Sequence, residues 1–556
     1  MIPPALLSLG RAARRRAVAA VLGLTAFVSV LAAQRGEGIV RDEVVYMDAG
    51  SRYASWWLDV ATFTGGTVTE AKITATFGGP PAKASNSEHP PLMKMLYGVS
   101  ERVFHDGLGW TSEVTGYRLP AALMFGVLVA LVALFAARVW GLAEGALAGA
   151  LVLLMPRLLF HAGLAAFDGP MVTMWFATVY AYYRSLSNRW WCIGLAVAFG
   201  CALATKHNAL MIPAALVVHY AWVAWRRERH VRGLWTVQPW IGAALFAGGP
   251  VVLFILWPWL WFDTFAHLET WIAFHLSHVH YHFEYLGHNW NAPPFPWHIA
   301  IVTTLFTVPV ATLVAGVIGC VELVNRARTG EAADADRAPA LLLFLSAGVA
   351  MGPFLLTSTP IFGAEKHWSS AMPTIAVFAA IGALAAARRA AAVLFDGDAR
   401  ARARTAVVAG VAVAVGAAAM VETVDAQPYA LSHYNALAGG APGGADLGMN
   451  RQFWGYAARG VLPWIAEHAP DGNVGVYTHD AQPAWGKYKG LGLRDDRLRD
   501  TGKEMPGIAA SRIAIVIHEL HFNRHDYMIW RAYGTVQPAF VLTTDGVPIV
   551  SVYVRP

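Results

Sequence analysis

The sequence predicts an α-helical polytopic membrane protein of about eleven transmembrane helices, followed by a C-terminal extracytoplasmic α/β domain. Two observations predict this class: the composition, and apolar runs of about 20 residues that recur along most of the chain. Of the 556 residues, 56% are hydrophobic and 14% are charged, and the mean hydropathy is +0.44. Soluble globular proteins carry about 45–50% apolar and roughly 25% charged residues. The composition therefore excludes a disordered chain, a fibrous repeat and an ordinary soluble enzyme.

The first apolar run begins directly after an arginine cluster. Residues 11–16 read RAARRR and precede the run 17–34, which we interpret as an uncleaved first span; a secretory signal peptide is the alternative. Further candidate spans follow at 118–138, 142–160, 169–186, 190–205, 207–224, 236–257, 298–321, 339–357, 368–386 and 405–424.

Arginine falls on one side of this predicted topology. With the N-terminus in the cytoplasm, the short cytoplasmic loops contain Arg138, Arg184, Arg189, Arg226, Arg227, Arg229, Arg232, Arg326, Arg328, Arg337, Arg388, Arg389, Arg400, Arg402 and Arg404. Cytoplasmic loops of membrane proteins carry an excess of Arg and Lys. The pattern indicates a multi-pass protein, and we expect it in a bacterial inner (plasma) membrane. It also explains the net charge of +6 better than a nucleic-acid surface does.

The opposite, extracytoplasmic side holds the longer connections. Residues 34–117 and 258–297 form two outer loops, and we place the boundary between a transmembrane domain and a C-terminal domain at residues 424 and 425. The C-terminal domain, 425–556, is predicted to be α/β because short apolar strands alternate with helical stretches. The strands are predicted at 473–479, 512–519 and 549–554, with a helix over 453–468.

Ionisable side chains gather at the mouths of the spans on this outer side. Charged groups at membrane level are costly, so they indicate a functional site. The set consists of Asp42 and Glu43 after the first span, Glu88, His89 and Lys94 in the first loop, Arg118, Asp168, Lys206 with His207, and Lys366 with His367. The three lysines and the arginine together predict a site that binds an anion at membrane level. The alternative is that these cations extend to the interface and contact only lipid head groups.

The second outer loop is rich in histidine. His278, His280 and His282 alternate, so an extended strand would put all three on one face. A metal site is one interpretation. We favour an aromatic-rich interfacial loop, because no supporting ligands accompany the imidazoles. We therefore expect no required metal or other cofactor. A divalent cation is the alternative, with Asp42, Glu88 and His278 or His280 as its first candidate ligands.

Several short motifs, taken in order, resemble the C-type membrane glycosyltransferases, specifically the protein O-mannosyltransferase and aminoarabinose-transferase-like group. The resemblance covers most of the chain. The motifs are the Asp42-Glu43 pair, HPPLMK (89–94), YRLPAALMFG (117–126), LAAFDGPM (164–171), ATKHNALMIP (204–213), YLGHNWNAPPFPWH (285–298), HYNALAGGAPGGADLG (433–448) and FWG (453–455).

The resemblance implies transfer of a sugar from a polyprenyl-phosphate carrier to an acceptor hydroxyl on the extracytoplasmic face, with inversion at the anomeric carbon. By resemblance, Asp42 corresponds to the catalytic base, and Glu43 orients it or binds a cation. The chemistry agrees with the polar groups present. A leaving phosphate needs positive charge where its negative charge develops, and the acceptor hydroxyl needs a base. His207 and His433 depart from the usual pattern, so the donor sugar does not follow from the resemblance.

The resemblance also assigns partners. The expected partners are a polyprenyl-phosphate-linked sugar, membrane lipids, and a lipid, glycan or protein acceptor, with no nucleic acid.

The alternative functions are a lipid or sugar transporter or flippase, and a non-enzymatic scaffold. Transporters place polar groups near the bilayer midplane, whereas the spans here are almost free of charge. The residues expected to line the substrate pocket are Glu88, His89, Asp168, His207, His278, His280 and His367.

Overall fold

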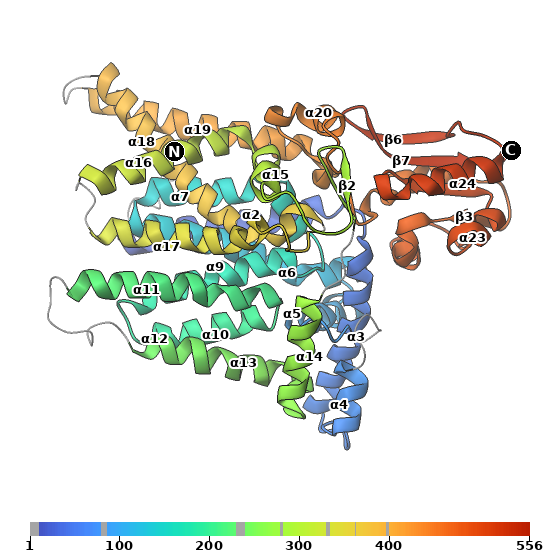
Figure 1. Ribbon diagram of the computed structural model, residues 1–556, viewed down its shortest axis with the longest axis horizontal. Helices are drawn as coiled ribbons and strands as arrows, with labels where there is room; N and C mark the ends of the chain where they lie inside the picture. Colours follow the sequence, from blue (N-terminus) through green and yellow to red (C-terminus); the bar gives the residue numbers. More distant parts are fainter. Residues whose placement is uncertain are drawn as a thin grey trace.

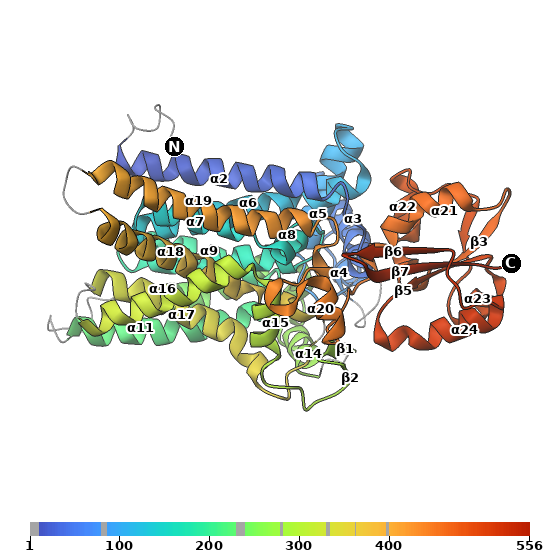
Figure 2. The ribbon, with the colours of Figure 1, turned by 90° about the horizontal axis from the view of Figure 1, so that it is seen from above.

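The computed structural model of the protein describes residues 10–78, 86–228, 239–277, 282–329, 334–361, 363–395 and 400–556. A bundle of long helices makes up one part, and a smaller α/β domain packs against one end of it (Figure 1). Seen from above, the long helices run roughly parallel to the long axis of the molecule (Figure 2).

Seven helical segments among the described residues are long and apolar enough to cross a membrane, so the chain is a multi-pass membrane protein. They are α2 (Arg11–Ala33), α6 (Glu113–Val139), His207–Arg226 including most of α11 (Ile212–Glu228), α16 (Val310–Thr329), Ala338–Leu355 including most of α17 (Asp334–Met351), Ser369–Leu394 including α18 (Met372–Leu394), and α19 (Ala401–Asp425). An eighth candidate consists of α7 (Leu142–Leu153) and α8 (Pro156–Ala162), which are bent by 72°.

The other apolar runs are helical as well, but shorter or less apolar. They form α9 (Asp168–Ser185), α10 (Trp191–Leu203), and α12 (Trp240–Ala243) with α13 (Gly249–Leu256). Each run that the sequence singled out therefore contains helix. The count of about eleven spans stays a prediction, because length and apolarity alone select seven or eight.

Small residues let the membrane helices approach closely. Gly319 of α16 and Gly382 of α18 lie in the contact between these helices. A Cβ on Gly319 would overlap the carbonyl oxygen of Phe378, and a Cβ on Gly382 would overlap that of Ala315. Close packing of this kind holds helices together in lipid, where apolar burial gives little gain.

The arginine-bearing ends of the helices gather at one end of the bundle. α11, α16 and α18 all run away from the α/β domain (Figure 1). Their carboxyl-terminal halves carry Arg226, Arg326 and Arg389. Arg326 and Arg389 both pair with Glu322, the former at 2.6 Å between Nε and Oε1. This grouping agrees with the one-sided arginine pattern of the sequence.

The first outer loop, expected over 34–117, is largely helical. α3 (Arg41–Ala61), α4 (Glu70–Phe77) and α5 (Leu92–Glu101) form it, and a π-helical turn continues α5. These helices are half-buried rather than apolar throughout, so a search for apolar runs does not find all of them. The second outer loop contains α14 (Thr264–Leu276) and an antiparallel hairpin of β1 (Phe283–Tyr285) and β2 (His288–Trp290), and α15 (Ile299–Thr307) follows it.

The C-terminal domain is built on a five-stranded sheet of order β4-β3-β5-β7-β6. The expected strands correspond to β3 (Val474–Tyr477), β5 (Ile513–Ile517) and β7 (Val547–Val554); the sequence missed β4 (Leu498–Asp500) and β6 (Phe540–Thr544). β3 pairs in parallel with β4 and β5, and β7 pairs antiparallel with β5 and β6. The helices of the domain are α20 (Gly440–Asp446), α21 (Leu462–His468), α22 (Trp485–Gly490), α23 (Glu504–Ala510) and α24 (Asn523–Tyr533).

The α/β domain shares a hydrophobic core with the start of α3. Ile39 and Val40 pack in one buried cluster with residues of the sheet, and the Ile39 N–H donates to the Tyr488 hydroxyl at 3.0 Å. Lys487 of α22 pairs with Glu113 of α6 at 2.6 Å between Nζ and Oε1. These contacts fix α22 beside the starts of α3 and α6.

Candidate active site

Asp42 stands in the first turn of α3, directly beside the α/β domain. The Arg41 N–H donates to the Trp454 carbonyl oxygen at 3.1 Å, which fixes where α3 begins. The Arg41 guanidinium pairs with Asp480 at 2.6 Å between Nη1 and Oδ1, and its Nε lies 3.7 Å from Oδ1 of Asp42. The Asp42 side chain is 32% exposed. Asp42 therefore presents a carboxylate that one arginine holds and that solvent can still reach.

Lys206 and Asp168 form a buried ion pair. Asp168 is the first residue of α9, where the helix N-terminus favours a negative charge. Lys206 follows α10, and its Nζ lies 2.7 Å from Oδ1 of Asp168. The two side chains are 9% and 8% exposed. Burial acts to raise the pKa of Asp168, but Lys206 and Lys366 outweigh it and hold that pKa below its usual range.

Lys366 belongs to a 3₁₀ turn, Ala364–His367, and lies within electrostatic range of the Lys206–Asp168 pair. The turn is entered at Gly363, whose φ of +70° suits glycine and whose missing Cβ leaves room for the Lys366 side chain. The Lys366 Nζ lies 3.9 Å from the centre of the Trp454 ring, a cation–π contact.

Two carboxylates act on Lys366 through their charge. Burial lowers the pKa of Lys366 to about 8, although Asp168 and Asp42 act in the opposite direction. Lys206 acts with burial, as a like charge. Asp42, Asp168, Lys206 and Lys366 thus form one electrostatic group, which we call the Asp42–Lys366 cluster.

A second group of buried charges lies next to this cluster. Arg157 of α8 pairs with Glu365 at 2.8 Å between Nη1 and Oε2, and also donates to the His433 carbonyl oxygen at 3.0 Å. His161 Nε2 lies 3.4 Å from the other oxygen of Glu365. The imidazole of His161 also acts on Asp168, which links the two groups. The sequence analysis singled out none of Arg157, His161 and Glu365.

The structure pairs Arg118 with Glu43. The Arg118 Nε and Nη2 atoms lie 2.8 Å and 2.7 Å from the two Glu43 oxygens, and Nη2 also donates to the Gly38 carbonyl at 2.6 Å. The Glu43 carboxylate accepts further bonds from the N–H groups of Val40 and Ala165 at 3.0 Å and 2.7 Å. Both side chains are buried. Neither residue therefore presents its charge to the Asp42–Lys366 cluster, unlike what the sequence led us to expect.

Lys94 is also directed into the protein. Its Nζ donates to the Asn86 and His89 carbonyl oxygens at 2.6 Å and 2.8 Å, and lies 3.4 Å from the Tyr53 hydroxyl. Burial lowers the pKa of Lys94 to about 7. The neighbouring Glu88 accepts from the Asn86 amide at 3.1 Å. Lys94 thus fixes the turn that precedes α5 rather than joining Lys206 and Lys366.

Several imidazole rings lie close together near the N-terminal end of α11. The His207 and His275 rings stack with their centroids 3.7 Å apart, and His89 lies 5.8 Å from His275. His367 follows Lys366, and its carbonyl accepts from the Asn208 amide at 3.3 Å. His278 and His280 lie outside the described residues.

Three further residues, in contact with Asp42 or Lys366 or with each other, also escaped the sequence analysis: Arg41, Trp454 and Asp480. Arg41 directly precedes the Asp42-Glu43 pair, and Trp454 lies in the FWG motif. Their positions in the sequence could therefore have identified both as candidate site residues. Asp480 follows β3, at the carboxyl end of a parallel strand where α/β sheets commonly place functional residues. Only the fold brings it to Arg41.

Comparison with known proteins gives one family and one fold. Residues 88–262 match the family model for dolichyl-phosphate-mannose-protein mannosyltransferase. The chain is similar in structure to ArnT from Cupriavidus metallidurans bound to undecaprenyl phosphate, at 15% identity and a TM-score of 0.51, with 96% of this chain and 97% of that chain covered. ArnT in the apo state matches at the same identity and coverage, with a TM-score of 0.50. No curated protein matches the chain.

A more distant likeness is to the apo oligosaccharyltransferase of Archaeoglobus fulgidus, at 11% identity and a TM-score of 0.46, covering 94% of this chain and 71% of that chain. The ArnT match defines the class of fold: a membrane helix bundle with a C-terminal domain that contains a sheet. The family match lies within residues 88–262, and the likeness to ArnT shows a shared fold over nearly the whole chain.

Proposed function

We propose that the protein transfers a sugar from a polyprenyl-phosphate carrier to an acceptor hydroxyl, with inversion at the anomeric carbon. The observation that carries this proposal is the Asp42–Lys366 cluster, in which buried Lys366 interacts electrostatically with the accessible Asp42 carboxylate and with the buried Lys206–Asp168 pair. The family match of residues 88–262 supports the reaction class. The ArnT structure holds undecaprenyl phosphate, which supports the same class of carrier here.

Lys206 and Lys366 are the proposed partners of the donor phosphate. When the bond between the anomeric carbon and the phosphate oxygen breaks, the electron pair stays on that oxygen. Preorganised positive charge at this point stabilises the transition state. Both ammonium groups of the cluster are buried, whereas only one of its two carboxylates, Asp168, is. The buried part of the cluster therefore carries a net positive charge that an anion can neutralise. A lipid phosphate suits the position of these two lysines, because its polyprenyl tail can remain beside the membrane helices while the phosphate contacts the ammonium groups.

Asp42 is the proposed general base. It accepts the proton of the acceptor hydroxyl while that oxygen attacks the anomeric carbon on the face opposite the phosphate. The Arg41 Nε lies 3.7 Å from the Asp42 carboxylate and helps to hold it in place. Asp480 holds the Arg41 guanidinium at 2.6 Å, so the α/β domain contributes to the positioning of the base.

The contacts favour a structural role for three residues first expected in the reaction. Arg118 and Glu43 satisfy each other, and Lys94 is engaged by carbonyl oxygens. A buried guanidinium with a bidentate carboxylate has little to gain from a second anion. We therefore omit Arg118 and Lys94 from the phosphate site, and Glu43 from catalysis.

The residues proposed to line the sugar pocket surround the cluster. Asp168 and His207 adjoin Lys206, and His367 adjoins Lys366. Glu88 and His89 precede α5, and His275 accompanies His207. His278 and His280 keep their place in the proposal through the sequence alone. None of the proposed steps requires a metal ion, and a lipid, glycan or protein can supply the acceptor hydroxyl.

We propose a bacterial inner-membrane location, with residues 1–424 as the transmembrane domain and residues 425–556 as an extracytoplasmic domain. The one-sided arginine pattern supports this orientation. Reporter fusions after Arg232 and after Tyr434 should report the cytoplasm and the extracytoplasmic space respectively. The same compartment for both would contradict the orientation.

Purified protein tests the proposed reaction. Incubation with a panel of undecaprenyl-phosphate-linked sugars and membrane lipid acceptors should release undecaprenyl phosphate, detected by mass spectrometry. The same panel of donors, tested in proteoliposomes, distinguishes a transferase from a flippase. Movement of intact donor across the bilayer without release of undecaprenyl phosphate would favour the flippase and contradict the transferase.

A further inference from the structure

The turn that follows α5 is a π-helix, Arg102–Gly107. A π-helix closes each turn over five residues instead of four, so residues i+4 and i+5 both return close to residue i. Here residue i is Glu101, and residues i+4 and i+5 are His105 and Asp106. In a regular α-helix only the i+4 residue would share the face of Glu101. Short π-helical turns of this kind occur often at functional sites.

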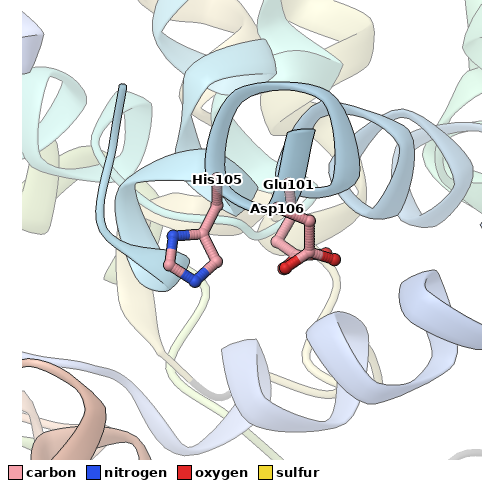
Figure 3. A group of neighbouring side chains, drawn as sticks. All are labelled: Glu101, His105 and Asp106. Atoms are coloured by element: carbon pink, nitrogen blue, oxygen red, sulfur yellow. The ribbon is translucent and has the colours of Figure 1, made fainter. Parts of the chain in front are cut away.

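The turn brings three metal-ligating side chains together. One ligand atom each of Glu101, His105 and Asp106 lies within 4.8 Å of the other two. Figure 3 shows the three side chains projecting to the same side of the helical turn. Ligands on a tetrahedral ion at about 2.1 Å are separated by about 3.4 Å. Small side-chain rotations therefore suffice to close this group around one cation.

Glu101 is buried without a partner. It is only 6% exposed, and within the described ranges its carboxylate forms no hydrogen bond or ion pair; His105 and Arg102 act on it through their charge alone. It lines a cavity of about 580 Å³, together with Asp106 and Glu113. A buried carboxylate without a partner is costly unless a cation joins it. The cavity provides the space for that cation and for water molecules that complete its coordination.

Three cations line the cavity: Arg52, Arg102 and Lys487. Lys487 pairs with Glu113 at 2.6 Å between Nζ and Oε1. Arg102 donates through Nη2 to the Ser55 hydroxyl. Neither forms an ion pair with Glu101 or Asp106 within the described ranges, although the charge of Arg102 acts on Glu101. The Nε and Nη2 atoms of Arg52 have no hydrogen-bond partner there.

The imidazole of His105 is oriented as in a metal ligand. Its Nδ1 lies 2.8 Å from the Thr111 carbonyl oxygen. A proton on Nδ1 donates to this carbonyl and leaves the lone pair of Nε2 free. Metal-bound histidines commonly donate their second ring nitrogen to a carbonyl or carboxylate in this way.

We propose that Glu101, His105 and Asp106 bind one divalent transition-metal ion, with Zn²⁺ as the best fit. Two carboxylate oxygens and one imidazole nitrogen form a ligand set that suits Zn²⁺. Mg²⁺ and Ca²⁺ prefer oxygen ligands alone and fit less well. The site lies on the far end of α5 from Lys94 and uses no residue of the Asp42–Lys366 cluster. The ion therefore stabilises the π-helical turn and takes no part in sugar transfer.

Metal binding to the untagged full-length protein tests this proposal. Apo protein, prepared with a chelator and exchanged into metal-free buffer, is titrated with ZnCl₂, and bound metal is counted by elemental analysis. We expect one tight Zn²⁺ site per chain and a higher Tm with Zn²⁺. Glu101→Gln and His105→Ala should each weaken binding by at least about tenfold, because even supporting residues of metal sites cost that much.

Two matched variants serve as controls. Asp48→Asn removes another carboxylate of the same cavity. His468→Ala removes a histidine whose Nδ1 also binds a carbonyl oxygen, at 3.0 Å, but which lies on the exposed surface. Both should leave Zn²⁺ affinity unchanged. Absence of tight Zn²⁺ binding, or binding that survives both Glu101→Gln and His105→Ala, would overturn the proposal. Should these variants fail to fold, anomalous scattering at the zinc edge from wild-type crystals decides: a peak must lie between the three side chains.

Discussion

Lys206 and Asp168 form an ion pair of 2.7 Å between Nζ and Oδ1, with both side chains more than nine-tenths buried. Lys366 acts electrostatically on the same carboxylate. One aspartate is thus shared by two lysines from separate parts of the chain. Burial of a charged group costs roughly several kcal/mol, even after the protein has relaxed around it. A purely structural ion pair with Asp168 needs only one lysine. The second lysine is the feature that a phosphate-binding site explains.

Removal of either lysine should slow the reaction strongly. Lys206→Met and Lys366→Met each keep the aliphatic chain and lose the charge that faces the leaving phosphate. Loss of one such group typically costs about 10²–10³-fold in kcat. The measurement is kcat of purified, folded protein at saturating acceptor. If both variants stay within about threefold of wild type, well below that expected loss, these lysines do not hold the phosphate.

Lys94→Met provides the matched comparison for these two variants. Its ammonium donates to the Asn86 and His89 carbonyls instead of facing the cluster. We expect a lower Tm, because the carbonyls lose their donor, but kcat of the folded protein within about threefold of wild type. A loss in kcat as large as that expected for Lys206→Met, about 10²–10³-fold, would return Lys94 to the phosphate site.

Asp42→Asn should remove the general base and preserve the shape of the site. Loss of a general base costs about 10²–10⁴-fold in rate. Asp48→Asn, on the same helix but exposed, is the control and should stay near wild type. Turnover with saturating donor distinguishes the two variants. Near wild-type turnover of folded Asp42→Asn would show that another group takes the proton.

The rate should fall as pH rises through about 8, the value to which burial lowers the pKa of Lys366. The protonated ammonium is the form that binds phosphate, so kcat/KM, which reports the free enzyme, declines above this pH. Stability has the opposite sign. Because the folded-state pKa lies below that of the unfolded chain, this group favours folding more as pH rises from about 8 toward its unfolded pKa, about 10.4. Lys366→Arg keeps its charge and should lose the decline; an unchanged pH profile in this variant would exclude Lys366 as its source.

The Glu43–Arg118 pair should matter for folding. Removing one member of a buried pair leaves an uncompensated charge and costs about 3–5 kcal/mol. Glu43→Gln and Arg118→Met should each lower the Tm strongly in detergent. Arg524→Ala breaks a pair with Glu504 that is more than half exposed, and should cost less than about 1 kcal/mol. Normal stability of both buried variants would contradict the structural role.

The sequence predicted the architecture well because membrane insertion imposes a simple pattern. Every apolar run contains helix, and β3, β5 and β7 coincide with the three expected strands. β4 and β6 were missed because three residues at 498–500 and a half-buried edge strand carry too little apolar signal. The helical first loop was also missed in part, since half-buried helices mix polar and apolar residues.

The candidate site was only partly predictable. The predicted topology places Lys94, Arg118, Lys206 and Lys366 on the same side of the membrane. The direction of each side chain, however, depends on partners far away in sequence. Arg118 meets Glu43 across 75 residues. Asp480 reaches Arg41 across 439 residues. Such pairs have no local signal, so the sequence cannot separate a cation that faces a ligand from one that a carboxylate already neutralises.

A structure of the protein with undecaprenyl phosphate tests the central claim most directly. The account predicts phosphate oxygens within about 3 Å of the Nζ atoms of Lys206 and Lys366, the usual length of a charge-assisted hydrogen bond. It also predicts that Glu43 and Arg118 remain paired. A phosphate held by Lys94 or Arg118, with Lys206 and Lys366 unchanged and out of contact, would contradict it.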